Sequence, residues 1–169
     1  MKQPAKLAQK DTEARWTQKH GKNYYGYKNH MAIDVKHKLV RGFTVTPAST
    51  HDSQEFETLL KVPNTLKAVW ADGAYQSEAH TELLKSYGIQ NHVHARPWRE
   101  QTLTPAQQRH NKSRSRIRAR VEHVFGHQVT AMHQTIVRTI GQARAEIKIG
   151  LANLAYNMSR LGQLERLAI

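Results

Sequence analysis

The stretch from Leu66 to Ala95 limits the fold more than any other part of the chain. It opens with the unbroken apolar run Ala68–Ala71, which is typical of a strand buried on both faces and which stops at Asp72. A helix is predicted from Ser77 to Tyr87, and alternating apolar and polar residues follow from Ile89 to Ala95. Strand, helix and strand in this order predict two parallel strands joined by a right-handed crossover, and hence an α/β protein.

A β-hairpin is expected before this unit. From Tyr24 to Val35, apolar and polar residues alternate with the period of two that half-buried strands show. A second strand is predicted from Leu39 to Thr46, after a short turn at Lys36–Lys38, and Pro47 should end it.

Two long helices are expected in the second half of the chain. Beyond Pro105 an apolar stripe has helical spacing and consists of Ile117, Val121, Val124 and Phe125. A last helix is predicted over roughly Ile140–Leu161. Basic residues are concentrated around the start of the first helix, where the only acid is Glu100 and the cations are Arg96, Arg99, Arg109, Lys112, Arg114, Arg116, Arg118 and Arg120.

The overall charge indicates the class of partner. The chain has 26 Lys and Arg against 13 Asp and Glu, a formal net charge of +13, so its electric field favours polyanions and nucleic acid is the expected partner. The absence of cysteine excludes disulfides, thiolate zinc sites and a cysteine nucleophile. No apolar run approaches the ~18 residues of a membrane span, and no signal peptide is evident, so we expect a cytoplasmic protein without a membrane partner.

Residues 1–23 differ from the rest of the chain. They carry Lys, Gln and Asp with almost no apolar periodicity, so we expect a polar arm or a remnant linker there, without a strand. Residues 24–169 fit one domain, because single domains mostly run from ~50 to ~200 residues.

Two acids are the candidate catalytic residues. Asp72 follows the end of a buried strand, where open α/β sheets bind ligands, although a turn residue or helix cap is the alternative. Glu122 lies on the apolar-striped helix one turn after Arg118, and an ordinary surface ion pair is its alternative. Carboxylates that meet from different elements can hold two Mg²⁺ ions about 4 Å apart for phosphodiester chemistry.

Four blocks of the chain resemble, in order, blocks of bacterial insertion-sequence transposases of the DDE class. They are YYGYKNH at 24–30, THDS at 50–53, ADGAY at 71–75 and IRARVEHVFG at 117–126. LANLAYN at 151–157 is similar to the last helix of these proteins. The resemblance implies a ribonuclease-H-like fold, an α/β mixed sheet flanked by helices, and makes Asp72 and Glu122 the second and third acids of the DDE triad.

The same resemblance implies an activity and its partners. A DNA transposase would cut and join phosphodiester bonds with Mg²⁺ or Mn²⁺, with Asp72 and Glu122 as metal ligands. The expected partner is double-stranded DNA, at element ends and target, in the bacterial nucleoid, and a homodimer is left open. The expected phosphate contacts are Lys28, Lys112, Arg114, Arg116, Arg118 and Arg120.

Three positions depart from the family's pattern, and one element has no match. Ser115 stands where tyrosine is usual, Val129 where lysine is usual, and Ala74 where glycine is common. The family's first aspartate lies on a strand before the hairpin, and the neighbours of Asp11 are polar throughout, unlike a buried strand. We therefore expect the first, central strand to be missing and the chain to be inactive as it stands.

The other acids and the histidines have simpler interpretations. Asp34 is expected in the hairpin turn, and Asp52 is expected to cap a short helix. A rival zinc site could be built from the pairs His92/His94 and His123/His127, but HVFGH lacks the internal glutamate of a zinc peptidase.

Two other functions stay open at this point. One is a non-catalytic DNA-binding remnant, in which the basic helix binds duplex DNA and the acids are relics. The other is an RNA-binding module, for which Tyr24, Tyr25 and Tyr27 would have to form exposed aromatics on a sheet face. A metal-dependent nick would separate the transposase from both.

Overall fold

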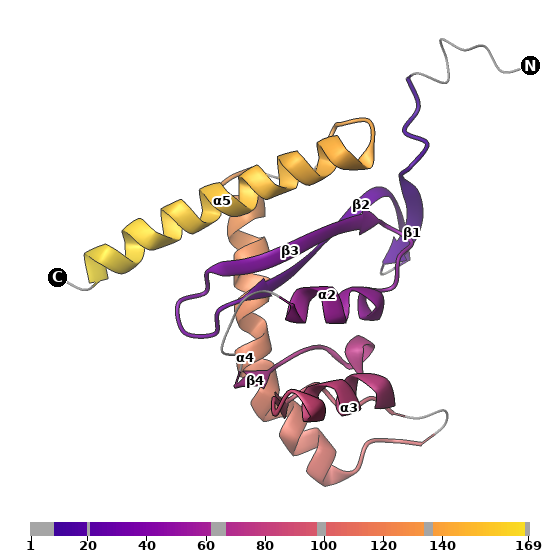
Figure 1. Cartoon of the computed structure of the whole chain (residues 1–169), viewed down its shortest axis with the longest axis vertical. Coiled ribbons are helices and arrows are strands. Elements are labelled where there is room, and N and C mark those ends of the chain that lie inside the picture. Colours follow the sequence, from indigo (N-terminus) through magenta and orange to yellow (C-terminus); the bar gives the residue numbers. More distant parts are fainter. Residues whose placement is uncertain (1–8, 20, 62–66, 98–100, 134–136, 168–169) are drawn as a thin grey trace, which may run out of the picture.

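The chain folds into two small sheets and a set of helices (Figure 1). The computed structural model describes residues 9–19, 21–61, 67–97, 101–133 and 137–167. The strands are β1 (Arg15–Lys19), β2 (Lys22–Ile33), β3 (Val40–Pro47), β4 (Ala68–Val69) and β5 (Gln90–Asn91). The helices are η1 (Asp52–Glu55), α2 (Phe56–Leu60), η2 (Gly73–Tyr75), α3 (Glu78–Ser86), α4 (Pro105–Thr130) and α5 (Gln142–Leu167). The prediction of a mixed α/β fold is confirmed.

The predicted hairpin is present. β2 and β3 pair antiparallel, from Tyr27 opposite Pro47 to Ile33 opposite Val40. Asp34 belongs to the turn as predicted, because its carboxylate accepts a hydrogen bond from the backbone N–H of His37.

The prediction that residues 1–23 contain no strand is wrong. β1 pairs antiparallel with the first part of β2, from Arg15 opposite Gly26 to Lys19 opposite Lys22. This strand is mostly exposed. It is held by backbone pairing with β2 and by an aromatic contact between Trp16 and Tyr25, whose ring centroids lie 5.1 Å apart. A strand that buries no face has no hydrophobic alternation, so periodicity could not reveal it.

The strand–helix–strand unit is also present. β4 pairs parallel with β5, and the backbone bonds continue to His94 N–H, which donates to Ala71 O. α3 connects the two strands and is capped by Ser77, whose hydroxyl accepts a hydrogen bond from His80 N–H. The expectation that Ala68–Ala71 is buried on both faces is wrong, since these residues are only half-buried and line an open groove.

α4 runs past both sheets and contributes to holding them together (Figure 1). It begins at Pro105, after a capping box: the Thr104 hydroxyl accepts a hydrogen bond from Gln107 N–H, and the Gln107 side chain accepts one from Thr104 N–H. Val124 is fully buried in the first hydrophobic cluster, with Val40 and Tyr156. A second cluster joins α2, α3 and the segment after β5 and consists of Phe56, Leu84 and Val93.

α5 lies across the β2–β3 hairpin (Figure 1). The face that packs on the sheet consists of Ala145, Ile149, Ala152, Asn153 and Tyr156, all of them buried. The Asn157 side chain bonds both the N–H and the carbonyl of Val40, so α5 is joined to the first residue of β3 by polar contacts as well. Among the described residues, no helix has the length and apolar character that a membrane span requires.

Gly150 sets how closely α5 approaches the hairpin. A Cβ at this position would lie 2.8 Å from Cζ of Phe43 on β3. Gly162 is on the same helix, and a Cβ there would meet nothing within 4 Å. We expect Gly150→Ala to lower the free energy of unfolding by about 1–3 kcal/mol relative to Gly162→Ala, because overpacking outweighs the gain in helix propensity. Urea denaturation of the two variants measures the difference, and equal stabilities would show that Phe43 yields without cost.

Candidate active site

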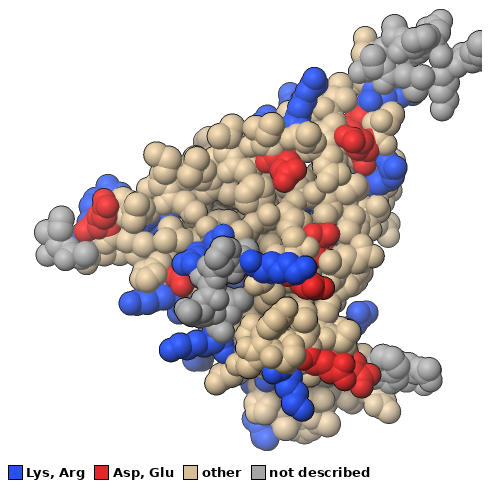
Figure 2. Space-filling view, in the orientation of Figure 1, with Lys and Arg blue, Asp and Glu red and all other residues tan. Residues whose placement is uncertain are grey.

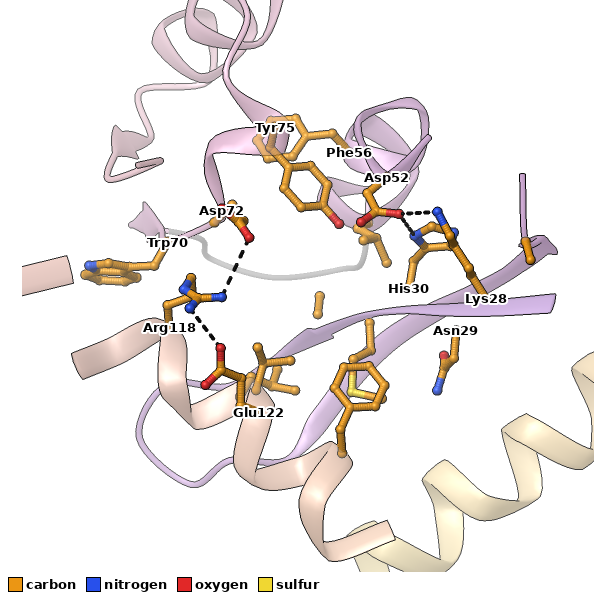
Figure 3. Close-up of a pocket in the computed structure, with 18 of the residues that line it drawn as sticks. Lys28, Asn29, His30, Asp52, Phe56, Trp70, Asp72, Tyr75, Arg118 and Glu122 are labelled. Atoms are coloured by element: carbon orange, nitrogen blue, oxygen red, sulfur yellow. Dashed lines mark hydrogen bonds and ion pairs between the residues drawn. The ribbon is translucent and has the colours of Figure 1, made fainter. Parts of the chain in front are cut away.

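Asp72 and Glu122 come together at Arg118 (Figure 3). The guanidinium Nη2 lies 2.8 Å from Glu122 Oε1, and Nη1 lies 3.7 Å from Asp72 Oδ2. Because one guanidinium contacts both acids, the two carboxylates face the same space although they come from different elements. Their catalytic and metal-binding roles remain predictions.

Local structure presents both carboxylates to solvent. Asp72 follows β4 and is the N-cap of η2, where its carboxylate accepts a hydrogen bond from Gly73 N–H. Glu122 lies one turn after Arg118 on α4. The side chains of Asp72 and Glu122 are 61% and 57% exposed, and exposed ion pairs of this kind contribute at most ~1 kcal/mol. The arrangement therefore adds little to stability and keeps the two acids accessible.

The two acids lie at a large groove between the sheets. Its volume is about 1170 Å³, and it is lined by parts of β1, β2, α2, β4 and α4. Much of the lining is apolar, from Met31, Ile33, Phe56, Leu59, Leu60, Val69, Ile117, Val121 and Phe125. Among the described residues, β4 pairs only with β5, and the Tyr27–Ile33 part of β2 pairs only with β3. Each of these strands therefore keeps one unpaired edge.

A third carboxylate, that of Asp52, lines the same groove. Lys28 Nζ lies 3.1 Å from Asp52 Oδ1, and His30 Nδ1 lies 3.8 Å from the same atom. The prediction that Asp52 caps the short helix is wrong, because His51 is the N-cap of η1 and its ring nitrogen accepts from Ser53 N–H. Asp52 instead ties the first helical turn after β3 to β2.

Tyr75 lies near the carboxylates of Asp52 and Asp72. Burial raises the pKa of its hydroxyl to about 12, and the negative charges of Asp52, Asp72 and Glu55 act in the same direction. Figure 3 shows the hydroxyl pointing towards Asp52. At neutral pH it stays protonated, so it can donate a hydrogen bond inside the groove.

His94 also belongs near this site, although the sequence pattern indicated it only as part of the possible zinc pair His92/His94. It follows β5 as Asp72 follows β4, and the ends of parallel strands meet at one edge. Burial lowers the pKa of His94, the positive charges of Arg118 and Arg114 lower it further, and Asp72 acts in the opposite direction. Its Nε2 is buried without a hydrogen-bond partner, as is Nε of Arg118. The ring is therefore neutral at pH 7 and lies near Asp72 and Arg118.

The site offers carboxylate ligands that suit a divalent metal, but the described residues provide too few of them. Carboxylate oxygens are what Mg²⁺ and Mn²⁺ prefer. In the described part of the chain, however, no group of three or more His, Cys, Asp or Glu side chains is placed to hold a metal ion. Asp72 and Glu122 also share a guanidinium, which occupies the position of a cation. By themselves, the described residues do not form a complete metal site.

The predicted phosphate contacts do not share one surface. Arg114 donates to Val93 O, Arg120 donates to Val35 O, and Arg118 binds the two acids. Lys28 pairs with Asp52 and donates to Thr50 O. The two remaining predicted contacts, Lys112 and Arg116, are exposed on α4, together with Arg109. Figure 2 shows Lys and Arg side chains gathered over the lower part of the molecule, where Figure 1 places α3 and the beginning of α4.

The histidine and tyrosine alternatives are not favoured by the geometry. Trp70 stacks on His92, whereas His127 packs edge-on against Tyr156 in the other half of the molecule, so the histidine pairs are apart. Tyr24 and Tyr25 are about half exposed, but the Tyr27 hydroxyl donates to the Asp11 carboxylate. The three tyrosines therefore do not form one exposed aromatic platform.

Comparisons with known proteins point to one family. A family model described as "Transposase DDE domain" matches residues 2–158. The transposase for insertion sequence element IS1106 of Neisseria meningitidis serogroup B is 32% identical over 121 residues, which is 69% of this chain. The same alignment covers 40% of that relative, so the chain spans well under half of its length. No solved structure matches the chain.

The pKa of His94 tests the arrangement of the site. Removing the positive charge with Arg118→Gln should raise this pKa, and removing the negative charge with Asp72→Asn should lower it further. Glu122→Gln is the matched control and should change it less, since Glu122 is not among the groups that act on His94. NMR titration of the His94 ring measures all three, and a pKa that neither Arg118→Gln nor Asp72→Asn moves would show that the three side chains are not together.

Proposed function

The chain belongs to the family of transposases with a DDE domain, and we propose that it is part of the catalytic domain of an insertion-sequence transposase that cuts and joins DNA phosphodiester bonds. The observation that carries the proposal is the meeting of Asp72 and Glu122 at Arg118, beside a groove that is open to solvent. Two exposed carboxylates at a strand end and on a neighbouring helix fit the second and third positions of the DDE triad.

Asp72 and Glu122 are proposed to supply two of the ligands for Mg²⁺ or Mn²⁺. When bound, such ions activate a water or hydroxyl and stabilise the leaving oxygen of a phosphodiester. Arg118 is proposed as a positioning residue, because it holds both acids in one place and lessens their mutual repulsion. The protonated Tyr75 lines the groove near Asp72 and is proposed to donate a hydrogen bond to a substrate there.

The missing ligand is proposed to come from a strand that occupies the groove in the whole protein. A strand there could pair with the unpaired edges of β2 and β4, and both of its faces would meet apolar side chains. The unpaired edge of β2 runs over the seven residues Tyr27–Ile33, so a strand that pairs with all of it would be about 23 Å long. An acid on this strand close to Asp72 would complete a set of three carboxylates, which the described residues lack.

DNA contact is proposed to centre on the exposed cations of α4. Arg109, Lys112 and Arg116 are spaced i, i+3 and i+7, so they lie on one side of the helix. Arg114 and Arg120 donate to backbone carbonyls of the segment after β5 and of the hairpin turn, and are proposed to act mainly as structural residues. Binding through phosphates alone would depend steeply on salt and little on sequence.

A second function, a non-catalytic DNA-binding remnant, is favoured by one observation. The site has two acids already paired with a guanidinium, and the described residues offer no third ligand beside them. The two functions differ in whether adding the missing strand creates a nuclease.

We expect the 169-residue chain to bind duplex DNA and not to nick it with Mn²⁺, because the metal lacks a ligand. Fusing the preceding segment of its source reading frame in cis should restore metal-dependent nicking of the element ends, and Asp72→Asn in the longer protein should reduce the rate by 10³-fold or more, as an order-of-magnitude expectation for losing a metal ligand. Asp34→Asn is the matched control, since this carboxylate accepts a hydrogen bond in the hairpin turn and does not line the groove.

Nicking by the 169-residue chain alone, abolished by Asp72→Asn, would show that another acid of this chain completes the site. A longer protein that binds DNA but never nicks would favour the non-catalytic remnant.

A further inference from the structure

α5 has an apolar face that the described part of the chain leaves exposed. The helix packs on the hairpin through one side, and the opposite side is exposed (Figure 1). Five large apolar residues lie on the exposed side, with exposed fractions of 51–67%: Ile147, Leu151, Leu154, Met158 and Leu161. Contiguous apolar surface of this kind commonly marks a site of protein association.

The spacing of these residues is that of a helix–helix seam. Successive members are separated by four, three, four and three residues, which is the heptad pattern with apolar residues at positions a and d. On an ordinary surface helix of this length, the side that faces solvent would carry polar residues instead. The stripe from Ile147 to Leu161 is about 21 Å long, enough for several layers of side-chain packing.

The ends of the seam carry opposite charges. Continuing the same spacing by three residues before Ile147 leads to Arg144, and by four residues after Leu161 leads to Glu165. Both side chains are exposed. The seam therefore runs from a cation, through five apolar residues, to an anion.

We propose that α5 pairs antiparallel with α5 of a second copy of this chain. In this arrangement Arg144 faces Glu165 of the other copy at both ends, and Leu154 lies near the two-fold axis. A parallel pair would instead place Arg144 on Arg144 and Glu165 on Glu165, which is unfavourable. The charge pattern thus selects a second copy in one orientation.

This interface would leave the candidate active site accessible. None of the residues that line the groove belongs to α5, and the exposed cations Lys112 and Arg116 are on α4. The proposal does not rest on the proposed function, because it depends only on the exposed face of α5. It also differs from pairing through the unpaired strand edges, which would involve β2 and β4.

Sedimentation velocity of the 169-residue chain over a range of concentrations tests the interface. We expect a monomer–dimer equilibrium, and Leu154→Lys should raise the dissociation constant by about 30-fold or more, as for a residue at the centre of an interface. Leu167→Lys is the matched control, since Leu167 is 79% exposed and lies off the seam. Circular dichroism should show unchanged helix content in both variants, because both side chains are largely exposed.

Charge exchange tests the orientation. Glu165→Arg alone should weaken the dimer, by roughly threefold to tenfold, and the double exchange Arg144→Glu/Glu165→Arg should restore it, because only an antiparallel pair brings the two positions together. A chain that stays monomeric at about 100 μM, a dimer that Leu154→Lys does not weaken, or a double exchange that fails to restore binding would each overturn the proposal.

Discussion

The position of α4 is the constraint on which the rest of the structure depends. In the described part of the chain, no ladder of strand hydrogen bonds joins the antiparallel sheet to the parallel one. α4 contacts both: Asn111 bonds the N–H and the carbonyl of Ala95, and Val124 is buried against the hairpin. Arg118 lies between these anchors, so the helix that joins the two halves also brings Glu122 to Asp72.

The same constraint explains the groove. A helix that spans both sheets keeps them at a fixed separation, and the space between β2 and β4 is lined by apolar side chains that no described residue covers. Water against apolar surface and unpaired strand edges are both unfavourable, so the groove is a surface that favours occupation. Polar groups line one part of this apolar groove, where Arg118 contacts both Asp72 and Glu122.

Much of this arrangement could be predicted from the sequence, for definable reasons. Alternation at Tyr24–Val35 and the apolar run before Asp72 predicted strands, because hydrophobic patterns reflect the period of the backbone, although the run is only half-buried in this chain. β1 was missed because it is held by backbone pairing and exposed aromatics, which leave no such pattern. His94 was missed as a site residue because its place beside Asp72 follows from the register of β4 and β5, which no local motif specifies.

The arginine run shows a further limit. The sequence predicted phosphate contacts from Arg114, Arg116, Arg118 and Arg120, but a helix turns about 100° per residue, so arginines two residues apart point in different directions. Arg114, Arg118 and Arg120 bind carbonyls or carboxylates of their own chain, and Arg116 is the member that is exposed. The charge count therefore agrees with the partner class that the family implies, while the individual phosphate contacts stay predictions.

Amide hydrogen exchange along β2 tests most directly whether the groove receives a strand. NMR can follow the amides of Lys28–Ile33 in the 169-residue chain and in a longer protein that includes the preceding segment. Because β3 occupies one edge, we predict that alternate amides exchange rapidly in the shorter chain and become protected in the longer one. Amides that are equally protected in both proteins, or that stay unprotected in the longer one, would contradict the account.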